Sequence, residues 1–247
     1  MVDIIVLGEK KMAEDLKLEI RKLFALHEAT LRLEHAFREV ALSGSTWQVF
    51  TPSRFIYAFF TFNSIYGFDW QSSFDEQKVI RWQQNDKGRY PTEEEQFKAY
   101  FGYVNAQLSP DTPTIFSEKL NQMLDWFGIT DPVTALEHID LVNANKKLKK
   151  LSKKVPNQFS VVLKGDQNPD EFYLSVSILL EFVYKVRCNL FHGTKTMVQL
   201  LNMEQQKRLL IYTALLITTN SLLFRVTEKS NIGWVKVSVE FSPSKGN

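Results

Sequence analysis

Three residues with chemically useful side chains lie close together in the stretch VYKVRCNLFHGTKT: Arg187, Asn189 and His192. An arginine can hold a phosphate through forked hydrogen bonds, and a histidine exchanges protons near neutral pH. These are the groups that metal-free RNA cleavage needs. The histidine would handle the proton of the 2′-hydroxyl or leaving group, while the arginine stabilises charge on the phosphorane. The alternative interpretation is structural, with a histidine that caps a helix and an arginine on its surface.

The spacing of Arg187 and His192 limits how they can meet. In a regular helix five residues turn through about 500°, which places these side chains about 140° apart. Gly193 is well suited to the left-handed conformation that often follows a helix end. His192 would then lie at the C-terminal cap, where it can turn towards Arg187. The negative end of the helix dipole also favours an imidazolium at that place.

Signals for other chemistry are weak. Four potential metal ligands share residues 26–37, namely His27, Glu28, Glu34 and His35. Their spacing is not HExxH, and no Cys/His cluster supports a metal site. The sequence also lacks a Walker loop, a GxGxxG loop and a GxSxG elbow. Cys188 lies on an apolar helix, where a free cysteine is usually inert. We therefore expect no metal and no cofactor.

The elements that must position these residues are predicted to be helices. Residues 11–42 have apolar side chains at steps of three and four, which is typical of a helix, and residues 204–224 are predicted to form another, strongly apolar helix. Capping residues or prolines open four more helices, at Thr92, Thr112-Pro113, Asp131-Pro132 and Asn168-Pro169. The last of these helices leads into the RCNLFH segment. The tail at 234–241 alternates apolar and polar residues, which predicts an edge strand or hairpin arm.

Residues 51–70 form an unusually aromatic segment, TPSRFIYAFFTFNSIYGFDW. Apolar side chains cover nearly every face, which predicts a buried helix that ends at Gly67. Its polar residues Arg54, Asn63 and Ser64 need partners or a cavity. Asn63 either packs with a satisfied side chain or lines a pocket.

Composition indicates a soluble globular protein. The chain has 247 residues, of which 44% are apolar and 23% charged, and a single cysteine that fits a reducing cytoplasm. No run approaches the ~20 apolar residues of a transmembrane helix. The net charge of +2 does not identify a partner, but residues 146–154 hold six lysines before the expected stop at Pro156. That run is either a solvated face or a local patch that attracts phosphates.

The segment RCNLFHG, between two long helices, resembles the HEPN family (higher eukaryotes and prokaryotes nucleotide-binding). The hallmark of this family is an arginine followed a few residues later by a histidine in an all-helical bundle. The wider phrase VYKVRCNLFHGTKT is similar to a bacterial branch of the family, and FNSIY at 62–66 resembles a segment upstream in such proteins. The resemblance is strong at 169–224 and weaker at 53–70, which is expected to pack on that core. We therefore expect one mainly helical domain, 1–247, of all-α class with additional N-terminal helices.

The resemblance implies a metal-independent endoribonuclease of the cytoplasm that acts in toxin–antitoxin, phage-defence or RNA-processing systems. Family members usually form homodimers in which the arginine and histidine of two chains meet, and RNA and an antitoxin protein are the implied partners. Carried over, Arg187 stabilises the phosphate and His192 is the acid/base. Asn189 would orient one of them. Lys185 and Lys195 would attract the RNA backbone, and Tyr184 or Phe191 would stack on bases.

One position departs from the family pattern. Active members commonly have a polar residue directly after the arginine, and this chain has Cys188 there. Some HEPN proteins are inactive and bind RNA, nucleotides or partner proteins. The alternatives to a nuclease are therefore a non-catalytic binding module and a helical interaction domain in which RCNLFH is only a helix end.

Overall fold

The computed structural model describes residues 14–42, 51–107, 110–137, 139, 146–166, 168–191, 199–200 and 202–229. Within these ranges the chain is all-α, as the sequence predicts. In chain order the helices are α1 (Glu14–Leu42), α2 (Thr51–Tyr66), α3 (Trp70–Asp75), α4 (Glu93–Gln107), α5 (Thr112–Trp126), α6 (Pro132–Glu137), α7 (Lys146–Ser152), α8 (Val155–Lys164), α9 (Pro169–Phe191) and α11 (Met203–Lys229). The strand expected at 234–241 lies outside the described residues.

Local capping signals correctly located the starts of several helices. At the start of α4, the backbone N–H of Thr92 donates to Oε2 of Glu95 at 2.6 Å, and the N–H of Glu95 donates to Oγ1 of Thr92 at 3.3 Å. This reciprocal pair is the predicted capping box. At the start of α9, Oδ1 of Asn168 accepts from the N–H of Glu171 at 2.9 Å. The helix that carries Arg187 therefore begins where the sequence predicts.

Two helices were not expected from the sequence. The short helix α3 is capped by Asp69, whose carboxylate accepts from the N–H of Ser72 at 3.2 Å. The prediction that Pro156 stops the lysine-rich segment was incomplete, because Pro156 lies in the first turn of a further helix, α8. A proline is favourable there, since the first N–H groups of a helix have no partner within it. Val155, Phe159 and Val162 give α8 a buried face.

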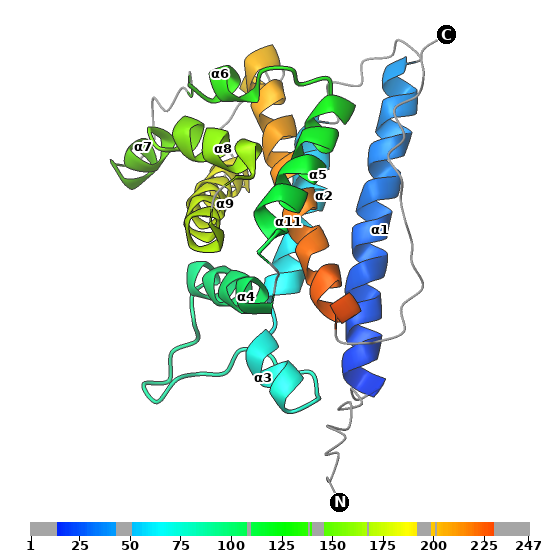
Figure 1. Cartoon of the computed structure of the whole chain (residues 1–247), viewed down its shortest axis with the longest axis vertical. Helices are drawn as coiled ribbons and strands as arrows, with labels where there is room; N and C mark the ends of the chain where they lie inside the picture. The colour runs from blue at the N-terminus through cyan, green and yellow to red at the C-terminus, as the bar shows by residue number, and fades with distance from the viewer. Residues whose placement is uncertain are drawn as a thin grey trace, which may run out of the picture.

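The helices α2 and α11 form the middle of the bundle. α2 packs most extensively on α11 and also contacts α1 and α4. Figure 1 shows α1 at one edge of the molecule and α8 and α9 towards the other. Every residue of α11 from Leu209 to Asn220 is buried. Phe55, Phe59 and Phe62 of α2 are fully buried as well, so the aromatic helix supplies much of the core.

The expectation that α2 is covered on nearly every side was wrong for one face. Tyr57 is 46% exposed and Phe60 is 43% exposed. These residues are one turn apart, so they share one outer strip of the helix. None of the helices that the structure describes has the length and hydropathy needed to cross a membrane.

The polar residue Arg54 within α2 has a buried partner on α1. Its Nε and Nη2 both donate to Oε2 of Glu34, at 2.7 and 2.5 Å. The side chains are only 6% and 1% exposed. The Arg54 guanidinium also lies 4.7 Å from the ring centre of Phe127. Burial raises the pKa of the Glu34 carboxyl, and the charge of Arg54 opposes that rise. The pair therefore ties α1 to α2 inside the core.

Candidate functional site

The helix α9 carries the predicted site residues Tyr184, Lys185 and Arg187 in its C-terminal half. Asn189 lies in the last turn of α9, which ends at Phe191, but only the backbone of these two residues is described. His192 and Lys195 lie outside the described residues. The expected approach of His192 to Arg187 therefore stays a prediction.

Arg187 lies where α9 meets α2 and α4. Its guanidinium carbon is 5.2 Å from the ring centre of Phe59 on α2, within the range of a cation–π contact. Its Nη1 is 3.7 Å from Oε2 of Glu93, the first residue of α4. The Arg187 side chain remains 24% exposed. A guanidinium in this position can rest on an aromatic ring and still present N–H groups to an anion.

Lys185 and Tyr184 extend the site along α9. Nζ of Lys185 is 3.5 Å from Oε2 of Glu94 and 4.9 Å from the ring centre of Tyr184. The Tyr184 ring lies 6.2 Å from that of Phe97 on α4. Each described cation of the predicted site therefore faces a glutamate from the start of α4.

Two tyrosine hydroxyls belong to the same region. The hydroxyl of Tyr66 donates to Oδ1 of Asn63 at 2.5 Å, so Asn63 has the partner that the sequence left open. Burial raises the pKa of Tyr66, and the charge of Glu93 raises it further while Arg187 lowers it. Burial also raises the pKa of Tyr184, and the hydrogen bond to Glu93 raises it further. Both phenols therefore remain neutral hydrogen-bond donors at physiological pH.

We call these residues the Arg187 cluster: Tyr66, Glu93, Tyr184, Lys185 and Arg187. The cluster draws on α2, α4 and α9, and it combines two cations, one carboxylate and two neutral phenols. Such a set can bind an anion through charge and hydrogen bonds. It can also exchange a proton through the carboxylate.

Sequence reasoning did not identify Glu93 or Tyr66 as site residues. Glu93 begins a run of three glutamates in the first turn of α4, a pattern that the helix dipole alone explains. Tyr66 ends an aromatic helix and gives no chemical signal. Their proximity to Arg187 results from packing between helices that are far apart in sequence.

The four potential metal ligands of α1 do not gather. His27 and Glu34 are buried on the inner face, Glu28 pairs with Arg32 at 2.5 Å, and the His35 ring lies 4.6 Å from that of Trp126. In the parts of the chain that the structure describes, no three metal-ligating side chains come together.

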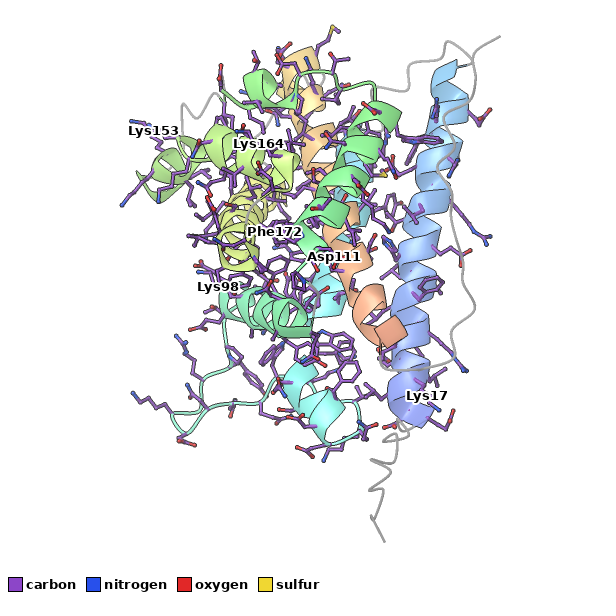
Figure 2. All side chains as sticks on the ribbon, in the orientation of Figure 1. Lys17, Lys98, Asp111, Lys153, Lys164 and Phe172 are labelled. Carbon is purple, nitrogen blue, oxygen red and sulfur yellow. The ribbon has the colours of Figure 1, made fainter. Side chains whose placement is uncertain are left out.

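The lysine run lies on and just after α7, which packs on α8 and α9. Its described lysine side chains are all exposed: Lys149, Lys150, Lys153 and Lys154. In Figure 2, Lys153 and Lys98 of α4 lie on opposite sides of α9, with Lys153 on the side of α7.

Cys188 is a half-buried free thiol beside Tyr184.

Three comparisons with known proteins gave no match, whether to protein-family models, to curated proteins or to solved structures.

Proposed function

We propose that the chain is a metal-independent endoribonuclease of the HEPN type that cleaves single-stranded or loop RNA. The observation that supports this most is the position of Arg187, which rests on Phe59, is partly exposed and lies where three helices meet. An arginine held in this way can clamp a phosphate without losing much side-chain freedom on binding. His192 supplies the acid/base group, Asn189 orients one of the two, and Lys185 and Lys195 attract the backbone.

The proposed reaction is an internal transesterification. The RNA 2′-oxygen attacks phosphorus, the bond to the 5′-oxygen breaks, and the products are a 2′,3′-cyclic phosphate and a free 5′-hydroxyl. His192 takes the proton of the 2′-hydroxyl or gives one to the leaving oxygen. Arg187 stabilises the extra negative charge on the phosphorane. The ring of Tyr184, whose hydroxyl is engaged by Glu93, can stack on a base.

The partners of this proposal follow from the family resemblance. The active form would be a homodimer in which Arg187 of one chain and His192 of the other share a cleft. Such an enzyme would work in the cytoplasm as a toxin or phage-defence effector, controlled by an antitoxin protein. In an unbroken helix, Arg187 and His192 of one chain would lie about 140° apart. A cleft that joins Arg187 of one chain to His192 of another does not require these two side chains to share one helix face, so this geometry supports the dimer.

The decisive experiment is RNA cleavage in EDTA by the wild type and by the His192→Ala and Arg187→Ala variants. The Arg32→Ala variant is the matched control, because Arg32 is an exposed arginine on α1. We expect each site variant to lose about a hundredfold or more in rate, as for a lost acid/base or charge-stabilising group. The control should match the wild type. Equal activity of wild type and His192→Ala, whether absent in both or present in both, would refute the assignment.

One observation favours a second candidate, a non-catalytic module that binds RNA, a nucleotide or a partner protein. Glu93 and Glu94 face both described cations and weaken their attraction for a developing phosphorane charge. Calorimetry distinguishes the two functions. Binding of single-stranded RNA that persists in the His192→Ala variant, with no cleavage by either protein, would support the binding module.

A further inference from the structure

The helix α1 has an unusual distribution of polar and apolar residues. Its inner face buries three polar side chains, His27 (5% exposed), Thr30 (3%) and Glu34 (1%). Its outer face exposes three leucines, Leu18 (52%), Leu26 (38%) and Leu33 (36%). An outer face that only met water would usually be polar. The exposed leucines therefore indicate that this face has another contact.

Small residues complete the outer face. Ala25, Ala29 and Ala36 are exposed too, and together with the leucines they lie within about 100° of arc at about 100° per residue. Four of these residues, Leu26, Ala29, Leu33 and Ala36, follow steps of three, four and three. We call them the α1 seam. This spacing is that of the contact line between paired helices. Figure 1 shows α1 at one edge of the bundle.

We propose that the α1 seam is a self-association surface that pairs with α1 of a second copy in antiparallel orientation. When the two helices cross at residue 31, Leu26 lies opposite the partner's Ala36 and Leu33 lies opposite the partner's Ala29. Each layer then joins one large and one small residue, so the backbones can approach to about 8 Å. A parallel pair would instead put leucine against leucine and alanine against alanine.

The charges beside the seam favour the same orientation. Lys22 lies one step of four before Leu26, so it continues the line of the seam, and it pairs with Glu19 of its own chain at 3.2 Å. Glu39 is exposed beside the seam, and the antiparallel register places Lys22 next to the partner's Glu39 at each end. A parallel register would place like charges together. Arg32 lies next to the two-fold axis, but Glu28 of its own chain balances its charge at 2.5 Å. The surface is therefore complementary to itself in charge as well as in size.

The small area of the seam indicates the class of complex that it can form. Four apolar layers are expected to bury less than about 1,200 Å², which is the range of weak and transient complexes. We therefore expect a dimer that forms reversibly as the concentration rises. The seam lies on the exposed face of α1, whereas the Arg187 cluster consists of residues of α2, α4 and α9. This association is thus separate from the shared nuclease cleft and does not rest on the proposed function.

Sedimentation equilibrium of the full chain tests the surface. The Leu26→Glu/Leu33→Glu double variant should weaken association about tenfold or more, because each glutamate would be desolvated against an alanine without a polar partner. Leu174→Glu is the matched control, since Leu174 is a 59% exposed leucine on α9. It should associate like the wild type. A wild type that stays monomeric, or a double variant that associates unchanged, would overturn the proposal.

Cross-linking with a short bismaleimide tests the orientation in a Cys188→Ser background whose fold is checked by circular dichroism. An Arg32→Cys variant should link to its partner copy, because the two positions lie beside the two-fold axis. A Leu18→Cys variant should not link, since its two copies lie about 39 Å apart along the helix axis. Linking at both positions means a parallel pair and linking at neither means another surface. Either result overturns the proposal.

Discussion

The carboxylate of Glu93 on α4 lies 3.7 Å from the guanidinium of Arg187 on α9, at the place where the sequence predicts phosphate binding. This separation is longer than a normal hydrogen bond. Loose and partly exposed ion pairs contribute about 0–1 kcal/mol, so an incoming phosphate can displace the carboxylate. Glu93 therefore orients Arg187 and at the same time competes with an anionic ligand.

The first prediction concerns this competition. A Glu93→Gln variant keeps the size of the side chain and removes its charge. We expect it to bind single-stranded RNA about two- to fivefold more tightly, in line with the small energy of such a pair. Glu95→Gln is the control, because Glu95 lies in the same turn but pairs with Arg89 at 2.6 Å. Fluorescence anisotropy measures both. Equal gains in the two variants would mean that total charge, not contact with Arg187, is responsible.

The second prediction concerns the buried pair of Glu34 and Arg54. Arg54→Met leaves the Glu34 carboxylate without its counter-charge and should reduce the free energy of unfolding by about 3–5 kcal/mol. The double variant Glu34→Leu/Arg54→Met should be more stable than that single variant, because no buried charge remains. Urea unfolding measures both. A double variant less stable than Arg54→Met would contradict the explanation.

The third prediction concerns the pH dependence of stability. Burial lowers the pKa of His27 from 6.5 to about 4, and the charge of Lys119 on α5 adds to this effect. As the pH falls from 6.5 towards 4, the unfolded chain takes up a proton that the folded protein does not, so stability falls. Over the whole range, this pKa shift reduces the free energy of unfolding by about 3 kcal/mol.

A His27→Gln variant isolates that contribution from the other titrating groups. Its unfolding free energy should change less between about pH 7 and pH 4.5 than that of the wild type. His27 also contacts Ser221 of α11 at 3.4 Å, so some loss of stability at neutral pH is expected. If the unfolding free energies of the two proteins change with pH in parallel, His27 does not contribute to the pH dependence of stability.

The fourth prediction concerns Gly165, which ends α8 with a φ of +67°. A Cβ atom there would lie 2.5 Å from Cβ of Ser117 and 3.0 Å from the carbonyl of Pro113 on α5. Gly128 has a φ of +69° and open space around it, so Gly128→Ala should cost only about 1–2 kcal/mol of backbone strain. Gly165→Ala should cost clearly more. If Gly165→Ala and Gly128→Ala have equal melting temperatures, α5 and α8 can move apart and accommodate the added Cβ atom at no cost.

The helices that the sequence predicted correctly are those with strong local signals. Caps such as Thr92 and Asn168 act on the backbone within one turn, so their effect does not depend on the rest of the fold. α3 is too short to show a period. α8 was missed because a proline after a lysine run was interpreted as a stop, although the same residue is favourable in a first helical turn.

The candidate site was only half predictable for a related reason. Arg187, Lys185 and Tyr184 are near one another in sequence, so spacing alone groups them on α9. Glu93 joins them only because α4 packs on α9. In the same way the sequence predicts that Arg54 needs a partner, but only the packing of α1 on α2 identifies it as Glu34.

The tie between α1 and α2 has a consequence for truncation. The HEPN resemblance points to a smaller unit made of residues 53–70 and 169–224. That unit would retain the buried guanidinium of Arg54 but lose the carboxylate of Glu34, and the orphaned cation would then lie in an apolar interior. Because α2 also provides Phe59 beneath Arg187, a chain shortened past α1 should lose the arrangement of the Arg187 cluster along with its fold.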